Sequence, residues 1–422
     1  MQVGLAYGRG RLDVELPPTT QVVEPAPGPP LPDPARALAA ALRDPVGCPP
    51  LAELARPGQR VALAVCDATR PQPRRLVVPQ VLAELEGKVA DEDVTILVAT
   101  GTHRPNTEAE LEEMLGPEVL GRYRVVNHDC RDPAGLADLG WAAPGLPARL
   151  NRLWVEADLR IATGLVEPHF FAGFSGGPKT VAPGLAGLDT ILELHSARRI
   201  ASPRATWGVV GPNPVQQGLR QVAALAPAHL CVDVVLGAGQ QPSGVFAGEA
   251  AACHARACAQ ARRAAMAPLR EPFDVVVTTN AGWPLDQNLY QAVKGMSAAS
   301  AVVRQGGLVV CAAECADGLP EHGSFAQILA SAPDPASLAR MIESPGYSAP
   351  DQWQAQVLAR VLSRCRVGVK ASFLTDEQLR GAHLEPVHDV AGRVGEELAR
   401  LGPRARVCAL PEGPRTVPYL AA

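Results

Sequence analysis

Short apolar runs alternate with polar turns and helical segments through the first half of the chain. Residues 60–66 (RVALAVC) and 94–99 (VTILVA) have the length and apolar character of buried strands. Each run passes through a polar turn into a segment of helical character, at about residues 75–86 and at 107–115. The second helix opens with Thr-x-x-Glu, the pattern of a capping box. Strands that alternate with helices in this way predict a parallel α/β sheet.

The same order of elements returns in the second half of the chain. A buried strand is expected at 273–278 (FDVVVT) and a helix at 289–300, so a second sheet of the same kind is predicted. We therefore expect two α/β domains with mainly parallel sheets and an active-site cleft between them. The N-terminal domain is expected to span residues 1–268 and the C-terminal domain 269–402, with a tail at 403–422 that can return to the N-terminal domain.

Weaker patterns complete the expected secondary structure. A strand pair around a Gly-Arg-Gly turn is expected within residues 1–16, and a hairpin is expected to join 232–236 to 244–247. Further strands are expected at 123–126, 159–163, 307–311, 366–369 and 406–410, and further helices at 35–42, 249–266, 325–330, 335–341 and 351–364.

Charge and composition exclude several classes of partner. The 422 residues carry a formal net charge of −4 with no long run of Lys or Arg, and only 4% are aromatic. A nucleic-acid partner is not expected, because the neutralisation of phosphates needs clustered cations. The N-terminus lacks a charged-then-apolar signal pattern and no apolar run reaches membrane length. Ten scattered cysteines without a C-x-x-C pair suit free thiols, so we expect a cytoplasmic location and no membrane partner.

Candidate chemistry gathers in one stretch, residues 166–199. It contains a Ser-Gly-Gly loop followed by Lys179, and two of the nine histidines, His169 and His195. Glycine lets a backbone approach a ligand closely, because it tolerates dihedral angles and contacts that a side chain forbids. An amine and two imidazoles around such a loop favour an active site. The competing interpretation is a tight turn between a strand and a helix, with His and Lys on the surface.

Four more polar residues follow the two buried strands of the first half. Asp67 and Arg70 follow the first strand, and His103 and Arg104 follow the second. In parallel α/β sheets, ligands bind at the carboxyl ends of strands and near the N-termini of helices. Helix capping or loop solubility explains any one of these residues alone, but four at equivalent positions favour a function.

Three kinds of chemistry fit these residues. Residues 173–180 approach the phosphate-binding pattern G-x-x-x-x-G-K-[ST], but Pro178 replaces the Gly before Lys and removes an N–H that such a loop needs. His103, His169 and His195 could form the zinc site of a hydrolase, although none has the H-E-x-x-H spacing. In the third alternative, two histidines exchange protons, a further histidine binds a metal, and the lysine of the loop holds a cofactor covalently. The residues by themselves leave these alternatives open.

Five motifs occur together and in order along the chain. They are D-x-T-R-P at 67–71, G-T-H-R-P at 101–105, E-P-H-F-F-A-G-F-S-G-G-x-K at 167–179, H-S at 195–196 and P-L-D-Q-N-x-Y-Q-A-V-K-G-M at 284–296. Over nearly the whole chain, this set resembles the lactate racemase family that uses a nickel-pincer nucleotide. The two long motifs make the resemblance specific.

The resemblance implies a role for each matching residue. Lys179 would join the cofactor through a thioamide, and His195 would ligate its nickel. His103 and His169 would be the pair of catalytic acids and bases. Pro178 stands where the best-known family members have a basic residue, which could change the pocket and the substrate. The other implied contacts are Asp67, Arg70, Gln291 and Lys294 for the substrate, and Ser175, Gly176, Tyr290, Lys294 and Trp353 for the cofactor.

The implied function is racemisation or epimerisation of a 2-hydroxy acid, such as lactate or malate, by reversible hydride transfer. The implied cofactor is a pyridinium-3-thioamide-5-thiocarboxylic acid mononucleotide that carries nickel. Inversion needs one base for the hydroxyl group of each enantiomer, which two histidines would provide. The implied partners are a small 2-hydroxy acid and the proteins that synthesise the cofactor. The alternatives are a carrier that holds the nickel cofactor without turnover and a His-liganded metallohydrolase. The sequence specifies neither the acid nor the oligomeric state.

Overall fold

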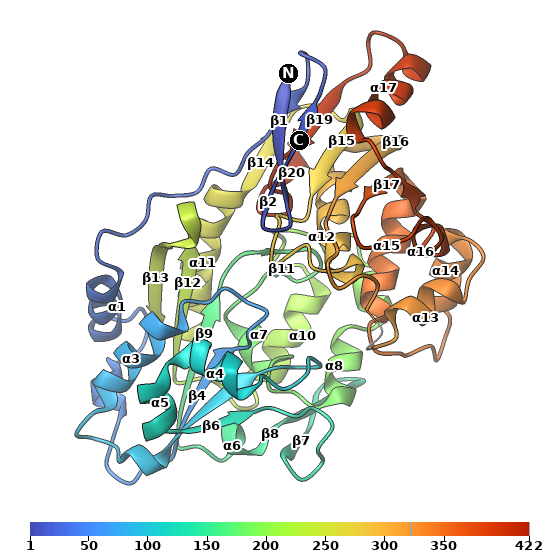
Figure 1. The fold of residues 1–422 in the computed structure, drawn as a ribbon. Helices are drawn as coiled ribbons and strands as arrows, with labels where there is room; N and C mark the ends of the chain where they lie inside the picture. The colour runs from blue at the N-terminus through green and yellow to red at the C-terminus, as the bar shows by residue number, and fades with distance from the viewer. Residues whose placement is uncertain (321–322, 422) are drawn as a thin grey trace. The chain divides into compact units, whose positions relative to one another are not determined.

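The computed structural model describes residues 1–320 and 323–421, and the chain divides into two compact units. Each unit is built around a sheet of six strands with helices packed against it (Figure 1). This confirms the expected α/β class. The N-terminal unit comprises Pro27–His195 and Arg204–Ala264, and the C-terminal unit comprises Met1–Ala26, Ser196–Pro203 and Ala265–Ala422.

The sheet of the N-terminal unit has the strand order β13-β12-β9-β4-β5-β6. Its strands are parallel except β13, which runs antiparallel to β12 at one edge. Continuous runs of Val, Ile, Leu and Ala fill the central strands, as expected of a sheet that is covered on its faces. The strands are β4 (Val61–Cys66), β5 (Val94–Ala99), β6 (Arg124–Asn127), β9 (Leu159–Leu165), β12 (Leu230–Leu236) and β13 (Pro242–Gly248).

The sheet of the C-terminal unit is parallel throughout, in the order β18-β17-β16-β15-β19-β3. Its strands are β3 (Gln21–Val22), β15 (Phe273–Thr279), β16 (Val303–Ala312), β17 (Arg366–Lys370), β18 (Glu385–Pro386) and β19 (Val407–Leu410). Smaller two-stranded sheets pair β1 (Gln2–Tyr7) with β2 (Gly10–Glu15), β7 (Leu136–Ala143) with β8 (Leu146–Asn151), β10 (Pro168–His169) with β11 (Gly173–Phe174), and β14 (Met266–Leu269) with β20 (Val417–Leu420).

Helices connect the strands of both sheets. Among the residues that the structure describes, no helix has both the length and the apolar character needed to cross a membrane. The helices of the N-terminal unit are α1 (Pro34–Arg43), α2 (Leu51–Leu54), α3 (Arg74–Leu85), α4 (Glu108–Leu115), α5 (Pro117–Arg122), α6 (Arg152–Val155), α7 (Pro178–Val181), α8 (Leu188–Leu194), α10 (Pro214–Ala223) and α11 (Ala250–Ala265). Those of the C-terminal unit are α9 (Ala197–Ile200), α12 (Leu289–Ser300), α13 (Phe325–Ala330), α14 (Pro335–Ile342), α15 (Gln352–Arg364), α16 (Asp376–Gly381) and α17 (Val390–Leu401).

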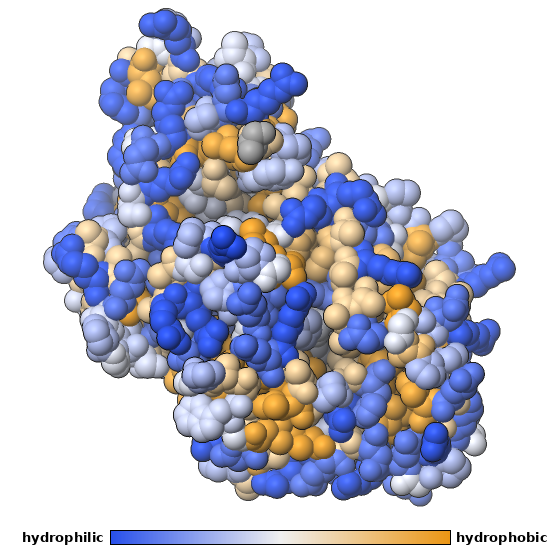
Figure 2. Space-filling model, turned by 180° about the vertical axis from the view of Figure 1, so that it is seen from behind, coloured by the Kyte–Doolittle hydropathy of each residue, from blue (hydrophilic) through white to orange (hydrophobic). Residues whose placement is uncertain are grey.

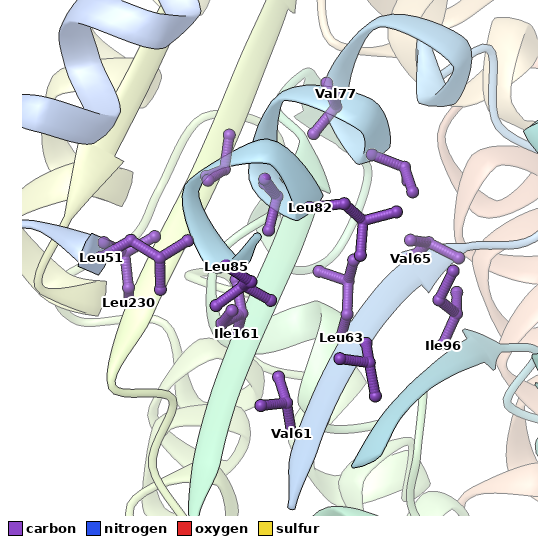
Figure 3. Packing of buried hydrophobic residues seen from close by; sticks show 14 of the residues in the cluster. Leu51, Val61, Leu63, Val65, Val77, Leu82, Leu85, Ile96, Ile161 and Leu230 are labelled. Atoms are coloured by element: carbon purple, nitrogen blue, oxygen red, sulfur yellow. The ribbon is translucent and has the colours of Figure 1, made fainter. Parts of the chain in front are cut away.

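Helix α3 covers one face of the N-terminal sheet and forms the core there. Figure 3 shows Val77 and Leu82 of α3 close to Leu63 of β4, with Ile161 of β9 in the same cluster. These side chains are almost completely removed from solvent. Burial of each contributes about 2 kcal/mol through the hydrophobic effect. The face of the molecule in Figure 2, by contrast, is largely polar, with apolar residues gathered in places.

Two terminal segments pack differently from the expectation. Residues 1–26, expected in the N-terminal domain, belong to the C-terminal unit, because β3 pairs with β19 at the edge of its sheet. The tail at 403–422 also joins the C-terminal unit instead of returning to the N-terminal domain, since β19 pairs with β15 and β20 with β14. An open sheet edge exposes backbone groups that need partners, and segments remote in sequence supply them here.

Most expected elements are present within one or two residues, including the capping box of Thr107 on α4. The main omissions are the β7–β8 hairpin and helices α8, α10, α16 and α17. Helix α10 shows why: Asn213 caps its first turn and Pro214 is its first residue. An Asn-Pro pair signals a turn as readily as a helix start, so the local pattern is ambiguous.

The Leu63→Ala substitution should lower the free energy of unfolding by about 2–5 kcal/mol, because it opens a cavity between α3 and β4. Leu225 is 42% exposed, so Leu225→Ala is a matched control with an expected change below about 0.5 kcal/mol. Urea denaturation followed by circular dichroism measures both changes. Equal denaturation midpoints for the two variants would contradict the assigned core.

Candidate active site

The loops that follow β4 and β5 meet at the carboxyl edge of the N-terminal sheet. Asp67 follows β4, His103 follows β5, and the two strands are parallel neighbours. The Nδ1 atom of His103 lies 2.6 Å from Oδ2 of Asp67. The other carboxylate oxygen of Asp67 accepts hydrogen bonds from the backbone N–H of Thr69 (3.2 Å) and from its hydroxyl group (2.6 Å). The structure thus brings together Asp67 and His103, two of the residues that the sequence analysis placed at strand ends.

Asp67 is ionised despite its burial. Burial by itself raises the pKa of Asp67, but the attraction and hydrogen bond of His103, with the positive charge of Arg70, lower it to about 2. A carboxylate can only accept a hydrogen bond, so Nδ1 of His103 carries the proton. In the neutral form of the ring, the basic lone pair is then on Nε2. Asp67 thus fixes which ring nitrogen of His103 is available to accept a proton.

The two arginines at these strand ends have different environments. Arg70 donates from Nη1 to the carbonyl and hydroxyl oxygens of Thr69, both at 3.2 Å, beside the Asp67 carboxylate. Arg104 instead forms a two-point salt bridge with Glu110 on α4, at 2.7 and 2.6 Å, and its side chain is 67% exposed. The guanidinium group of Arg104 is therefore paired with Glu110, whereas Asp67 is hydrogen-bonded to His103 and lies beside Arg70.

The glycine loop leads from the β10–β11 pair to α7, whose second residue is Lys179. Gly176 and Gly177 have positive φ angles of 72° and 51°, a region that favours glycine. The hydroxyl group of Ser175 donates to the carbonyl of Leu165 (2.7 Å) and accepts from the N–H of Glu167 (3.0 Å). Ser175 and Gly176 thus shape the loop, and their implied contact with a cofactor stays a prediction.

Two buried polar residues that the sequence analysis missed form hydrogen bonds to the backbone of this loop. Asp233 on β12 accepts a hydrogen bond from the N–H of Gly177 at 3.0 Å. His254 on α11 lies with Nε2 2.9 Å from the carbonyl oxygen of Ser175, to which it donates. Both residues are about 1% exposed, and burial raises the pKa of Asp233. A charged residue inside the apolar run LCVDVVL was the one available signal, since an unpaired buried carboxyl group is costly.

Lys179 is prepared for covalent chemistry. Burial lowers the pKa of Lys179 to about 8, and the positive charge of Arg70 acts in the same direction. A lysine with an ordinary pKa is almost completely protonated near neutral pH and is a poor nucleophile. With a pKa of about 8, about a tenth of Lys179 is neutral at pH 7, far more than for an ordinary lysine. The neutral amine is the form that attacks a carbonyl or thiocarbonyl carbon.

His195 has the character of a metal ligand. It follows α8 directly, is 5% exposed, and its Nδ1 atom lies 2.8 Å from the carbonyl oxygen of Ile191. A carbonyl can only accept, so Nδ1 carries the proton and Nε2 carries the lone pair. Burial lowers the pKa of His195 to about 4, assisted by the charge of Lys179, so the ring is neutral. Metal-binding histidines commonly donate from their other nitrogen to a backbone carbonyl in this way.

His169 is packed among aromatic rings and takes the opposite tautomer from His103. Its ring centroid lies 4.9 Å from that of Phe170 and 4.5 Å from that of Phe171. Phe171 also contacts the ring of His195, with centroids 5.3 Å apart. The backbone N–H of Ala172 donates to Nδ1 of His169 at 3.3 Å, so the neutral ring carries its proton on Nε2. The hydrogen bonds at Nδ1 thus differ between the two rings: Nδ1 donates in His103 and accepts in His169.

The site residues expected from the second domain cluster within the C-terminal unit. Lys294 donates to Gln291 on the same face of α12 (2.5 Å), and Trp353 of α15 donates from its indole N–H to the hydroxyl of Tyr290 (2.9 Å). The side-chain amide of Gln354 also donates to the Tyr290 carbonyl. These four residues of the sequence analysis thus lie together on two packed helices. Their meeting with the N-terminal set in a cleft stays a prediction.

Models of two protein domains match this chain. The lactate racemase N-terminal domain matches residues 7–208, and the lactate racemase C-terminal domain matches residues 269–417. The chain is 35% identical to the lactate racemase of Thermoanaerobacterium thermosaccharolyticum over 377 residues, 88% of each protein. The chain belongs to the lactate racemase family. The lactate racemase of Lactiplantibacillus plantarum is also 35% identical, over 374 residues and 88% of each protein.

Solved structures agree with membership of the lactate racemase family. The lactate racemase apoprotein from Thermoanaerobacterium thermosaccharolyticum matches with a TM-score of 0.92 and 32% identity, over 99% of this chain and 100% of that chain. A protein from Thermotoga maritima matches with a TM-score of 0.69 and 18% identity, over 94% of this chain and 100% of that chain, and shares the fold. The family and the fold class expected from the motifs are both confirmed.

Lys179 and His195 fit the kind of cofactor expected from the family resemblance. A covalent bond to the cofactor needs a neutral amine, and the lowered pKa of Lys179 provides one. A bond to nickel needs an imidazole lone pair, and the tautomer of His195 provides it on Nε2. Within residues 1–320 and 323–421, no three His, Cys, Asp or Glu side chains are grouped to hold a metal ion. The fit therefore rests on these two side chains.

Asp67 should make the stability of the protein depend on pH. Its folded-state pKa of about 2 is below the ordinary 3.8, so its stabilising contribution is complete above pH ~4 and is lost as the pH falls towards ~2. The loss should amount to about 2 kcal/mol. Asp67→Asn should therefore lose less stability than the wild type over this range, as measured by urea denaturation at several pH values.

Asp44→Asn, at an exposed position after α1, is the matched control for this pH experiment and should retain the wild-type pH dependence. A wild-type slope in Asp67→Asn would show that the carboxylate is not held in the ionised form.

Proposed function

We propose that this chain racemises lactate or a closely related 2-hydroxy acid, and that it does so with a nickel-pincer nucleotide. Two relatives named lactate racemase and both family domains support an isomerase of this class. The observation that supports the mechanism is the different hydrogen bonding of the two rings: Nδ1 of His103 donates to Asp67, and Nδ1 of His169 accepts from Ala172. A reaction that inverts a carbon bearing a hydroxyl group needs one group that removes a proton and another that returns it.

Lys179 would hold the cofactor covalently and His195 would ligate its nickel. When bound, the cofactor would supply a site that accepts hydride from the substrate carbon and returns it. A metal that already has ligands from an organic group needs few from the protein, and Nε2 of His195 suits this role. The rings of Phe170 and Phe171 would exclude water from this part of the site, because both are buried.

His103 would act first on one enantiomer. Its Nε2 atom would take the hydroxyl proton, and the Asp67 carboxylate would stabilise the resulting imidazolium through Nδ1–H. His169 would return a proton from Nε2 to the oxygen when the opposite configuration forms. To do so, His169 would first take up a second proton from solvent on Nδ1, in place of the long 3.3 Å hydrogen bond from Ala172, so that loss of the Nε2 proton leaves a neutral ring. The proton gained by His103 would return to solvent before the next turnover. For the other enantiomer the two histidines exchange roles.

Arg70 would bind the substrate carboxylate, because a guanidinium group can offer two parallel N–H donors to it. Gln291 and Lys294 would reach the substrate from the C-terminal unit, while Tyr290, Lys294 and Trp353 would contact the cofactor. Closure of the predicted cleft would then remove water from the planar keto acid. A cytoplasmic location and dependence on cofactor-synthesis proteins complete the proposal.

Incubation of the cofactor-loaded enzyme with a single enantiomer of lactate tests the proposal. Chiral chromatography should show the second enantiomer appearing until both are equal. The rate in His103→Ala and in His169→Ala should fall by about 100-fold or more in both directions, since each removes a proton-transfer group. His388→Ala, at an 81% exposed position, is the control and should keep the wild-type rate.

Two outcomes would favour the alternatives. Nickel and cofactor bound without inversion of lactate, malate or any related 2-hydroxy acid would identify a carrier. Loss of the metal in both histidine variants would instead indicate a histidine-liganded hydrolase.

Lys179→Ala should lack the covalent cofactor mass, because it removes the only atom proposed to form that bond. Intact-protein mass spectrometry measures this directly. Lys88→Ala is the control and should keep the mass, since Lys88 donates to the carbonyl of Ala52 away from the glycine loop. Retention of the cofactor mass in Lys179→Ala would remove Lys179 from its proposed role.

A further inference from the structure

Arg74 lies behind the loop that carries Asp67 and Arg70, and the proposed mechanism gives it no task. It is the first residue of α3 and is 8% exposed. Its Nη1 atom donates to three backbone carbonyls, those of Asp67 and Arg70 at 2.9 Å and that of Cys66 at 3.3 Å. The guanidinium group of Arg74 thus binds the backbone at the end of β4 and at both proposed site residues of the loop, Asp67 and Arg70.

Arg74 is placed where an arginine is unfavourable for local stability. The first turn of a helix carries a partial positive charge, which repels a cation. The Arg74 acceptors are carbonyls rather than a carboxylate, and its buried Nε atom has no hydrogen-bond partner among the described residues. Burial lowers the pKa of Arg74, which reflects the same cost. Neither helix propensity nor ion pairing explains a buried arginine here, whereas the three carbonyls do.

The three carbonyls belong to a loop whose shape determines the site. The N–H of Arg70 bonds to the carbonyl of Asp67 at 3.2 Å, and the N–H of Ala68 bonds to the side chain of Asn106 at 2.9 Å. These bonds turn the chain so that the Asp67 carboxylate reaches His103. Without Arg74, the carbonyls of Cys66 and Arg70 would lose this donor, and the turn would be free to relax.

We propose that Arg74 is a positioning residue, which holds the backbone of residues 66–70 so that Asp67 orients His103 while Arg70 meets the substrate carboxylate. This inference rests on the proposed function. Arg74 would act through Asp67 and Arg70, which have different proposed roles. Loss of Arg74 should therefore affect both proton transfer and substrate binding. Displacement of Arg70 weakens substrate binding and raises KM, and displacement of Asp67 impairs proton transfer and lowers kcat.

Arg74→Met tests the proposal, because methionine keeps much of the length of the side chain but has no donor. In the cofactor-loaded enzyme, kcat/KM for lactate should fall on the order of 100-fold, with a raised KM and a lowered kcat. In the cofactor-free protein, hydrogen exchange at the amides of residues 68–70 should be faster than in the wild type. The cofactor mass on Lys179 should be unchanged.

The neighbouring arginine supplies a matched control. Arg75 is exposed, and its guanidinium donates to the carbonyls of Glu112 and Glu113 at the end of α4, at 2.8 Å each. Arg75→Met therefore removes the same charge from the same helical turn without releasing the 66–70 loop. It should keep the wild-type kcat, KM and loop exchange. Equal losses in the two variants would reveal general destabilisation of α3 and overturn the positioning role.

Further outcomes separate the inference from the proposed function. Wild-type kinetics and wild-type exchange in folded Arg74→Met would overturn the role of Arg74. An inactive wild-type enzyme would instead refute the racemase proposal, and the exchange of residues 68–70 would still decide whether Arg74 holds the loop. Arg74→Lys replaces Arg74→Met if the latter does not fold, because lysine keeps a donor of shorter reach. The kcat/KM of Arg74→Lys should lie between the wild-type value and the value expected for Arg74→Met. Wild-type kinetics and wild-type exchange in Arg74→Lys would overturn the role of Arg74.

Discussion

The parallel pairing of β5, β4 and β9 is the constraint on which the candidate site depends. These three strands end at the same edge of the sheet, and the loop that follows each of them carries candidate site residues. Cys66 at the end of β4 pairs with Ala99 at the end of β5, which brings the loops of Asp67 and His103 to the same level. The loop after β9 then supplies His169 and Lys179. A slip of the register would separate the carboxylate from the imidazole, which are bound at 2.6 Å.

Burial sets the protonation of the polar groups at this edge, with different results for each. It lowers the pKa of Lys179 and of His195, because desolvation disfavours the charged form and outweighs the attraction of Asp67 and Glu167 for Lys179. Asp67 stays ionised because His103 and Thr69 donate hydrogen bonds to its carboxylate and Arg70 adds a positive charge nearby. The residues near this sheet edge therefore include an amine with a lowered pKa, a neutral imidazole and a charged carboxylate.

The segment after His195 is a point where the chain passes from one unit to the other. His195 is the last residue of its part of the N-terminal unit, and the next residue, Ser196, already belongs to the C-terminal unit. There Gln356 of α15 donates to the carbonyl of Ala197 at 3.0 Å, and Arg360 of the same helix donates to Ile200. Helix α15 also carries Trp353, so one helix anchors the chain beside the proposed nickel ligand and supplies a proposed cofactor contact.

The sequence by itself determined the alternation of strands and helices, the family, and the residues at the strand ends, because periodicity and short motifs record local preferences. The hydrogen bond of Asp67 to His103 follows from that order, since neighbouring parallel strands end together. Asp233 and His254, in contrast, reach the glycine loop from 56 and 79 residues away. Only the tertiary structure decided these supports, the tautomers of the histidines and the placement of residues 1–26, because each depends on which distant backbone group needs a partner.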